Sequence, residues 1–415
     1  MKKLVVAALT VLTSMDQVQA FRPIPESEVT ASLIEGREVT SLSEMERSGL
    51  NQGKTGIDLW SGNYWPHFQG SLAVRYRNSS VMKLIESKAQ WEKFKENSTK
   101  QPLYSFLGNN DNLSPAEKYD LIVGDYTMTL TKYSWELGDK AAAIGKVPIW
   151  RGICDGWASA SQMMPRPAKK VIMKTPDGQP VTFFPEDIKA LGSLLYARAQ
   201  ENVIFLGKRC RSRALGLFTN ACDETNAGTF HRALINRVGK MKKSFIADVS
   251  PGSEVWNYPV LSYDITYFNV FTEEESKDFK VAMEWFVKKN RFAKDGKRHK
   301  RTAAIVGVKA VVRYADMRPS NLLDTDDQSA DKVLEKEYLY DLEIDHNFNI
   351  LGGESISANL PDFIWAPNDR TYPLSEPEHV STPGNRSELT AMARIASKKG
   401  QPLSIIVEQL FESAK

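Results

Sequence analysis

The order of helical and strand-like segments is the feature that most constrains the fold. Ser114-Pro115-Ala116-Glu117 combines an N-cap hydroxyl, a proline at the first helical position and the glutamate of a capping box, which together predict a helix start. Further helices are predicted from Cys154 and from Pro185. After residue 229 the pattern changes to short runs rich in β-branched and aromatic residues, which are typical of strands. The predicted strands cover residues 229–236, 244–249, 263–270, 303–314 and 338–344, and two short helices at 387–397 and 403–411 follow.

Helices that precede a mostly antiparallel sheet indicate the α+β class. The chain has 415 residues, 42% of them hydrophobic, so it can bury a sizeable core in two or three structural units. The formal net charge is only +3, from 54 basic and 51 acidic residues. This balance argues against a dedicated nucleic-acid-binding protein, which usually carries a concentrated basic surface.

The first twenty residues follow the pattern of a signal peptide. Lys2 and Lys3 form a positively charged start, residues 4–12 form a short apolar run, and Val18-Gln19-Ala20 supplies small residues for cleavage after Ala20. A buried N-terminal strand or helix is the alternative. No later segment approaches about 18 continuous apolar residues, so we expect no membrane-spanning helix in the mature chain. We therefore expect a secreted or periplasmic protein.

The remaining chain divides into three parts. Residues 21–110 are rich in serine, asparagine, glycine and charge, and form either an irregular region packed on the core or a pro-segment that is removed later. Residues 111–370 hold the predicted catalytic core, and residues 371–415 form a C-terminal helical extension.

Export affects how the three cysteines are interpreted. An oxidising compartment favours pairing, and an odd number leaves one thiol free. Cys210 and Cys222 lie close together in a polar stretch and are predicted to form a disulfide; three free thiols are the alternative. Cys154 stands apart from both.

Cys154 is the candidate nucleophile. It lies between Gly152 and Gly156, and small residues follow it in a predicted helix. At a helix N-terminus, free backbone N–H groups and the positive end of the helix dipole stabilise the thiolate, which is the reactive form. The same N–H groups can hold an oxyanion. The alternative is a buried structural cysteine that happens to start a helix.

A thiol nucleophile needs a base and a group that orients the base. Of the five histidines, only His231 lies in an apolar segment predicted to be a strand, and Asp248 ends the next predicted strand. Adjacent antiparallel strands in the right register would place the two side chains on one face. A half-buried strand histidine and a turn-forming aspartate are the structural alternatives.

The order of cysteine, histidine and aspartate is the arrangement of the transglutaminase branch of papain-like enzymes. Six segments extend this resemblance: Gly152-Ile153-Cys154-x-Gly156-Trp157-Ala158, Asp187-Ile188-Lys189-Ala190-Leu191, Phe230-His231, Glu254-Val255-Trp256-Asn257-x-Pro259-Val260, Gly352-Gly353-Glu354 and Pro361-Asp362-Phe363-x-Trp365. Together they resemble the transglutaminase elicitor family of oomycetes, which also has bacterial members. The resemblance implies a papain-like core whose helical part carries the cysteine at a helix N-terminus and whose mostly antiparallel sheet carries the histidine and the aspartate.

The resemblance also implies residue roles and a reaction. Cys154 would be the nucleophile, His231 the base and Asp248 the orienting acid, with Asp187 as a second candidate for that acid. The thiolate would attack the γ-carboxamide of a protein-bound glutamine, ammonia would leave, and a lysine amine of a protein substrate would take the acyl group.

Asp155 departs from the family pattern, in which histidine often follows the cysteine. Its carboxylate would raise the pKa of the neighbouring thiol by like-charge repulsion. Trp135, Trp150 and Trp157 are candidates for lining the acyl channel, with a place in the core as the alternative.

The sequence requires no cofactor, although calcium is common among animal transglutaminases. The best candidate for a calcium site is formed by Asp324, Asp326 and Glu335. Ser329 stands where a calcium loop needs glycine, so a solvated acidic turn is the alternative. The sequence holds no zinc motif.

Two other functions stay open. A secreted cysteine peptidase, amidase or glutamine deamidase would use the same residues without incorporating an amine. A catalytically inactive binding protein would keep the fold, and its Cys154 would be inert toward iodoacetamide.

Overall fold

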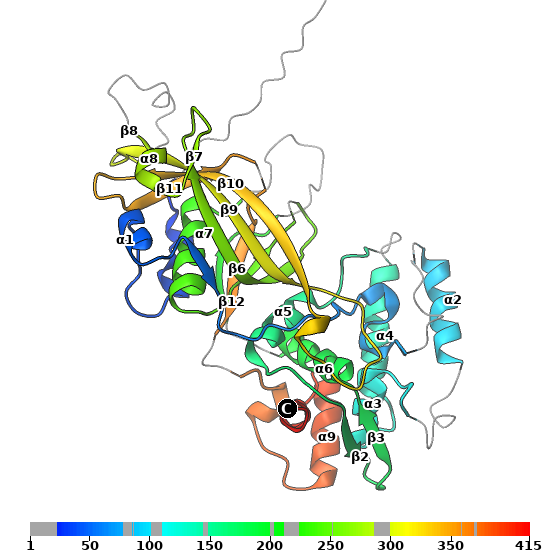
Figure 1. Ribbon diagram of the computed structural model, residues 1–415. Coiled ribbons are helices and arrows are strands. Elements are labelled where there is room, and N and C mark those ends of the chain that lie inside the picture. The colour runs from blue at the N-terminus through cyan, green and yellow to red at the C-terminus, as the bar shows by residue number, and fades with distance from the viewer. Residues whose placement is uncertain are drawn as a thin grey trace, which may run out of the picture.

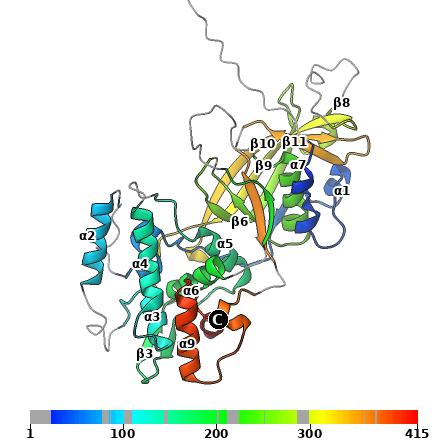
Figure 2. The same cartoon turned by 180° about the vertical axis from the view of Figure 1, so that it is seen from behind.

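The computed structural model describes residues 23–77, 85, 87–100, 110–143, 148–199, 203–210, 224–250, 252–285, 299–357, 359–368 and 372–415. The described chain forms two lobes, one made mainly of helices and the other built on a large sheet (Figure 1). The view from behind shows the same division, with one pair of helices nearest to the sheet (Figure 2). The predicted α+β class is confirmed.

Segments from both halves of the sequence build the helical lobe. Its helices are α2 (Lys88–Thr99), α3 (Pro115–Ile122), α4 (Thr129–Ala142), α5 (Cys154–Met163), α6 (Pro185–Arg198), α9 (Arg386–Ser397) and α10 (Ser404–Ser413). A small hairpin of β2 (Val171–Lys174) and β3 (Pro180–Phe183) belongs to the same lobe. The predicted helix starts at Ser114, Cys154 and Pro185 are therefore confirmed.

An antiparallel sheet organises the second lobe, in the order β11-β10-β9-β6-β5-β12-β4 among the described strands. Three further strands, β1, β7 and β8, pair at its margins. Their bounds are β1 (Gln52–Lys54), β4 (Val203–Gly207), β5 (Ile246–Asp248), β6 (Asn257–Phe268), β7 (Glu275–Ser276), β8 (Glu284–Trp285), β9 (Ala304–Asp316), β10 (Lys332–Ile344), β11 (Ile350–Ser355) and β12 (Phe363–Pro367). The helices of this lobe are α1 (Leu42–Arg47), α7 (Ala227–Ala233) and α8 (Phe279–Ala282).

Local sequence signals explain the helices next to the lobe junction. Ser114 Oγ accepts a hydrogen bond from Glu117 N at 3.2 Å, and Glu117 Oε2 accepts one from Ser114 N at 2.9 Å, so the predicted capping box is formed. In α6, Ile188, Leu191 and Leu194 are fully buried against the core of the helical lobe. Because α6 packs on α5, this burial also fixes the helix that carries Cys154.

The predicted strand at residues 229–236 is wrong. These residues belong to α7 and to the π-helical turn η7 (Leu234–Lys240) that continues it. Asn226 Oδ1 accepts a hydrogen bond from Gly228 N at 2.9 Å and caps the helix. Phe230, Ala233 and Leu234 then follow at helical spacing and are all buried in the sheet lobe. A short apolar run suits a buried strand and a buried helix equally well, and here the cap decides between them.

The N-terminal segment is built into both lobes. β1 pairs with β6, and Trp60 is buried in the core of the helical lobe, where its carbonyl accepts a hydrogen bond from Trp157 Nε1 at 3.2 Å. The carbonyl of Tyr64 accepts a hydrogen bond from Ile153 N at 2.7 Å, directly before Cys154. Loss of these residues would open the core, so we expect this part of the segment to remain in the mature protein.

The C-terminal helices complete the same helical core. Leu410 and Phe411 of α10 are fully buried, and Phe411 packs so tightly on α6 that a Cβ at Gly192 would lie 2.7 Å from its ring. Among the described helices, none combines the length and apolar character needed to cross a membrane.

Candidate active site

Cys154 is the first residue of α5, where the helical lobe meets the sheet. α5 packs on α6 and on β6, and the Cys154 side chain is only 5% exposed. Glycine is required two residues before Cys154 and two residues after it. A Cβ at Gly152 would lie 2.4 Å from the Tyr64 carbonyl oxygen, and one at Gly156 would lie 2.0 Å from the Ser193 carbonyl oxygen. The flanking glycines therefore let the start of α5 pack against its neighbours.

Two polar groups of the β5–β6 hairpin contact the thiol. Asn257 Nδ2 donates to Cys154 Sγ at 3.5 Å, and Cys154 Sγ donates to the Val255 carbonyl oxygen at 3.7 Å. Trp365 Nε1, from β12, donates to Asn257 Oδ1 at 2.8 Å and fixes the orientation of that amide. All three side chains are buried. Asn257 is thus held by the sheet with its N–H₂ group directed at the sulfur.

Asp248 lies beside Asn257 in the sheet. The two residues are register partners in the antiparallel pair β5–β6. Asp248 Oδ1 accepts hydrogen bonds from Trp256 N at 2.9 Å and from the backbone and hydroxyl of Ser250 at 3.3 and 2.9 Å. Oδ2 is buried and accepts no hydrogen bond from the described residues. One oxygen of this carboxylate is therefore anchored and the other is free for chemistry.

The environment favours the protonated forms of both groups. Burial, followed by the charge of Asp155, raises the pKa of Cys154 to about 12, and hydrogen bonds from Asn257 offset part of the rise. Burial raises the pKa of Asp248 to about 6. The thiolate stabilisation expected at a helix N-terminus is therefore outweighed, and the predicted effect of Asp155 is confirmed in direction. A thiol of this kind needs a base to remove its proton.

His231 is not placed beside Cys154. It lies in α7, which packs on β10 and β11, whereas α5 packs on α6 and β6. Figures 1 and 2 show α7 within the sheet lobe and α5 at its junction with the helical lobe. His231 Nδ1 lies 2.9 Å from Tyr340 Oη, and burial lowers its pKa to about 3. The predicted pairing of His231 with Asp248 on adjacent strands is wrong because residues 229–236 form no strand.

Asp187, the second candidate for the orienting acid, has a structural role. Its carboxylate caps α6 through Phe184 N at 2.8 Å, pairs with Lys118 Nζ at 2.6 Å and accepts from Tyr76 Oη at 3.0 Å. All its partners lie in the helical lobe or pack on it, and none belongs to the surroundings of Cys154.

The aromatic candidates occupy different positions. Trp157 is fully buried and meets Tyr258 edge to face, and Trp135 packs against Trp91 elsewhere in the helical lobe. Trp150 is half-buried, and the guanidinium groups of Arg151 and Arg209 lie 5.6 and 5.9 Å from its ring centre. It remains the one predicted channel residue near the surface of the site.

The three carboxylates of the calcium candidate do not converge. Asp324 pairs with Lys170 at 2.6 Å, and Glu335 of β10 pairs with Arg313 at 2.8 Å. Asp326 is buried and binds basic groups of Arg166, Lys189 and Arg318 at 3.1, 2.8 and 2.7 Å. Side chains of the protein thus neutralise each carboxylate, and the described residues contain no group of three or more metal-ligating side chains suited to a metal.

Two predictions depend on residues outside the described part of the chain. Cys154 is a free thiol. Cys210 is described but Cys222 is not, so their disulfide stays a prediction. The signal peptide, residues 1–20, also lies outside the described residues.

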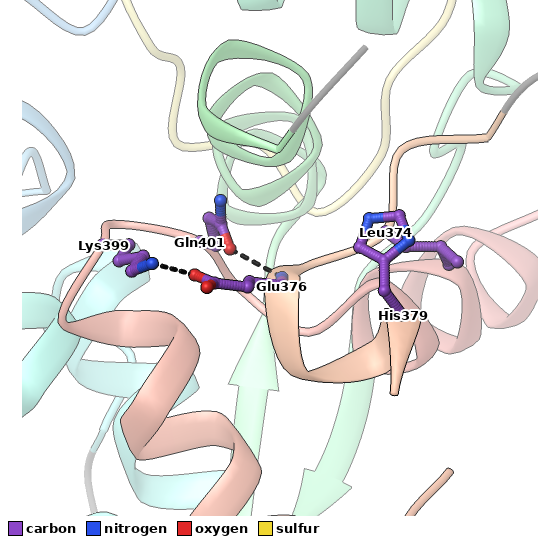
Figure 3. A pocket seen from close by; sticks show the side chains of 5 residues that line it. All are labelled: Leu374, Glu376, His379, Lys399 and Gln401. Atoms are coloured by element: carbon purple, nitrogen blue, oxygen red, sulfur yellow. Dashed lines mark hydrogen bonds and ion pairs between the residues drawn. The ribbon is translucent and has the colours of Figure 1, made fainter. Parts of the chain in front are cut away.

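A cavity of about 280 Å³ lies on the C-terminal extension, away from Cys154 (Figure 3). It is lined by Leu374, Glu376, His379, Lys399 and Gln401. Lys399 pairs with Glu376, and Gln401 Oε1 accepts from Glu376 N at 2.8 Å. These contacts join the α9–α10 turn to the 3₁₀ helix η10 (Glu376–His379), which indicates a packing role.

Sequence reasoning missed Asn257, Trp365 and Tyr64 as members of the site. Asn257 and Trp365 each lie in a segment that carried the family resemblance, but that resemblance gave them no role. Tyr64 lies in a segment without helix or strand, where no periodic pattern indicates a role. The charge of a Cys154 thiolate contributes to raising the pKa of Tyr64 to about 12, after burial, so its phenol lies near the sulfur.

Comparisons with known proteins agree with this architecture. The crystal structure of the GP42 transglutaminase from Phytophthora sojae has a similar fold, with a TM-score of 0.56 and 20% sequence identity over 91% of this chain and 94% of that chain. A comparison with curated proteins gives no significant match. The family model described as transglutaminase elicitor matches residues 39–377. Since this match covers most of the sequence, the chain belongs to the transglutaminase elicitor family.

Proposed function

We propose that this protein is a protein-glutamine γ-glutamyltransferase that forms an acyl-enzyme on Cys154. The observation that supports it most is the meeting of Cys154, Asn257 and Asp248 where α5 abuts the β5–β6 hairpin. Family membership and the similar fold of a known transglutaminase support the reaction class. We assign Asp248, in place of His231, as the base that serves Cys154.

In the acylation step, Asp248 takes the thiol proton as the sulfur attacks the γ-carboxamide carbon of a glutamine. A carboxylate whose pKa is raised to about 6 suits this role, because it is ionised at neutral pH and still basic enough to hold a proton. The C–N bond then breaks, and the leaving nitrogen takes the proton from Asp248 and departs as ammonia. A thioester remains on Cys154.

Asn257 acts on the sulfur during this step. Its Nδ2 donates to Sγ, and the Trp365 indole prevents the amide from rotating. A donor that is fixed before the reaction stabilises the sulfur as negative charge develops on it. We propose Asn257 as the group that makes a buried thiol with a raised pKa usable.

In the second step an amine attacks the thioester and Cys154 leaves as the thiol. Tyr64 lies near the sulfur, and its half-buried ring meets that of Trp256 edge to face with ring centres 5.3 Å apart. Tyr258 lies close enough that a Cys154 thiolate raises its pKa, although burial is the larger cause. This rim limits the entry of water, which favours an amine acceptor over hydrolysis.

Substrates and location remain part of the proposal. We propose proteins with accessible glutamine and lysine side chains as substrates, met in a periplasm or outside the cell after cleavage behind Ala20. Acylation of Cys154 and transfer to the amine use only side chains of this chain.

The experiment that tests this function is incorporation of dansylcadaverine into casein by the mature chain. We expect a signal that Cys154→Ala abolishes, a loss of at least about a thousandfold. Parallel reactions with calcium and with a chelator test the metal. Ammonia release without incorporation would instead identify a deamidase, and peptide-bond cleavage a peptidase. An unreactive Cys154 with neither product would identify a binding protein.

A further inference from the structure

Three carboxylates gather at the end of the sheet nearest to Cys154. Asp248 ends β5, and Asp362 immediately precedes β12, its antiparallel neighbour in the sheet. Glu224 lies beside Asp362. The charge of Asp248 acts on Cys154 at one side of this group and on Asp362 at the other. The carboxylates therefore extend away from the nucleophile as one group, which we call the acidic cluster.

The acidic cluster lacks the basic partners that the buried Asp187 and Asp326 of the helical lobe have. Asp248 and Asp362 are both at most 1% exposed. Asp248 Oδ2 and both carboxylate oxygens of Asp362 accept no hydrogen bond of normal length and angle from the described residues, although the backbone N–H groups of Cys210 and Gly252 lie near Asp362. A buried carboxylate without a partner is strongly unfavourable, as is breaking a buried ion pair. An arrangement of this kind indicates a site that a cation completes.

Nearby cations only partly compensate the charge. Arg209 favours the ionised form of Asp248, and burial lowers the pKa of Lys336 while the nearby charge of Asp248 offsets part of that fall. Lys336 Nζ donates to the carbonyl of Val249 and Arg209 is exposed at the surface. Burial and then repulsion by Asp248 and Glu224 raise the pKa of Asp362 to about 7, with backbone amides of Cys210 and Gly252 offsetting part of the rise.

The chemistry of the acidic cluster suits an organic cation. Within the described chain, no group of metal-ligating side chains has an arrangement suited to a metal ion. Glu224 is engaged by Ser355 and by the backbone of Leu360, which leaves Asp248 and Asp362 as the open members of the cluster. Two carboxylates next to a thioester suit an alkylammonium, which donates several hydrogen bonds from one charged nitrogen.

We propose that Asp362, together with Asp248, binds the ammonium group of the amine that accepts the acyl group from Cys154. This inference rests on the proposed function and adds that the acceptor is recognised as a cation. Asp362 holds the ammonium while Asp248 removes one proton from it. The neutral amine then attacks the thioester carbon, the C–N bond forms, the C–S bond breaks, and the departing sulfur takes the second amine proton.

The test compares a cationic acceptor with an uncharged one. Cadaverine is an ammonium ion at neutral pH, whereas hydroxylamine is largely uncharged. We expect Asp362→Asn to raise the KM for cadaverine by about tenfold and to leave kcat/KM for hydroxylamine unchanged, because only the cationic contact is lost. Asp324→Asn is the control: it removes an exposed carboxylate that pairs with Lys170 outside the acidic cluster, so less than about a twofold change is expected.

A second measurement uses the unmodified protein and does not depend on the folding of a variant. The derivative of cadaverine in which both nitrogens carry two methyl groups has the same two positive charges and forms no stable amide. It should inhibit cadaverine incorporation competitively and leave hydroxamate formation from hydroxylamine almost unaffected. Equal losses for both acceptors in Asp362→Asn, or no inhibition by the tertiary amine, would overturn the acceptor site alone. Failure of the wild-type protein to use either acceptor would overturn the proposed function as well.

Discussion

Asp187 in the helical lobe and Asp248 in the sheet lobe are both fully buried aspartates, yet their surroundings differ. Asp187 is matched by the ammonium of Lys118, by a backbone N–H and by a tyrosine hydroxyl. Asp248 is anchored through one oxygen and leaves the other unpaired. Burial alone therefore does not separate a structural acid from a chemical one. In this pair the difference is the ammonium on Asp187, whereas the buried Asp120 is held without a cation by Leu130 N and by Thr131.

The same contrast extends to the wider surroundings of each residue. In the helical lobe, Glu186 and Asp326 are also buried, and Lys189 and Arg318 lie between them. In the sheet lobe, the carboxylate oxygens of Asp362, like Oδ2 of Asp248, are buried without a hydrogen bond of normal geometry from the described residues. We infer that the paired acids of the helical lobe fix its fold and that Asp248 and Asp362 serve the reaction, whereas Glu343 of the sheet lobe is bonded to Thr302 and has a structural role.

The largest expected effect comes from Asp248→Asn. Loss of the base should lower kcat for amine incorporation by about 10²–10⁴-fold. The wild-type rate should rise with pH through about 6 as Asp248 ionises, and this limb should be absent from the variant. A pH–rate profile measured on both proteins checks this. An unchanged limb near pH 6 in the variant would assign the base elsewhere.

The same substitution should not weaken the fold. The pKa of Asp248 is raised in the folded state, so its contribution to stability is present below its ordinary pKa and is lost as pH rises through about 6. Asp248→Asn should therefore be more stable than wild type above that pH, by up to about 3 kcal/mol. Denaturant unfolding at pH 5 and pH 8 measures the difference, and a destabilised variant at pH 8 would argue for a structural aspartate.

Asp187→Asn should give the opposite result. It leaves Lys118 buried without its counter-charge, which costs about 3–5 kcal/mol of unfolding free energy. The folded fraction of Asp187→Asn should show the same rise of the amine-incorporation rate near pH 6 as the wild type. The double variant with Lys118→Met should recover most of the lost stability, and failure to recover would mean that the cap on α6 outweighs the ion pair.

Asn257→Ala should have an intermediate effect, on the thiol itself. Removing the donor to Sγ should slow alkylation of Cys154 by iodoacetamide about tenfold and move its pH dependence upward. Trp365→Phe keeps the ring and removes only the hydrogen bond to Asn257, so a smaller, roughly fivefold effect is expected. An equal effect of both would indicate that Trp365 contacts the substrate as well.

The smallest effect is expected for His231→Gln. It removes the contact with Tyr340 from the core, which costs about 1 kcal/mol of unfolding free energy. Cys154 alkylation and the pH limb should stay as in the wild type, and thermal unfolding together with the alkylation rate checks both parts. Loss of activity without loss of stability would restore His231 as the base.

Local sequence signals were sufficient for the helix starts at Ser114 and Pro185 and for the place of Cys154 at the start of α5. The capping box at Ser114 and the glycines around Cys154 act within a few residues of the chain, so they can be read without tertiary information. The periodicity of the apolar run around His231 fits both a strand and a helix. The cap at Asn226 and packing on the sheet make it a helix.

The partners of Cys154 could not be derived from local pattern. Asn257 reaches the sulfur because β5 and β6 pair in one register, and Trp365 reaches Asn257 because β12 lies on the other side of β5. Register and strand order of this kind depend on the whole sheet. The sequence predicts Asp248 for the site from its place at a strand end. Its pairing with Asn257 underlies our proposal that it acts as the base and does not orient a histidine.

The most direct test of this account is the pH dependence of amine incorporation by the wild type, Asp248→Asn and His231→Gln, measured side by side. The account predicts that the limb near pH 6 is present in the wild type and in His231→Gln and is lost, together with most of the rate, in Asp248→Asn. A limb that survives in Asp248→Asn and disappears in His231→Gln would contradict it.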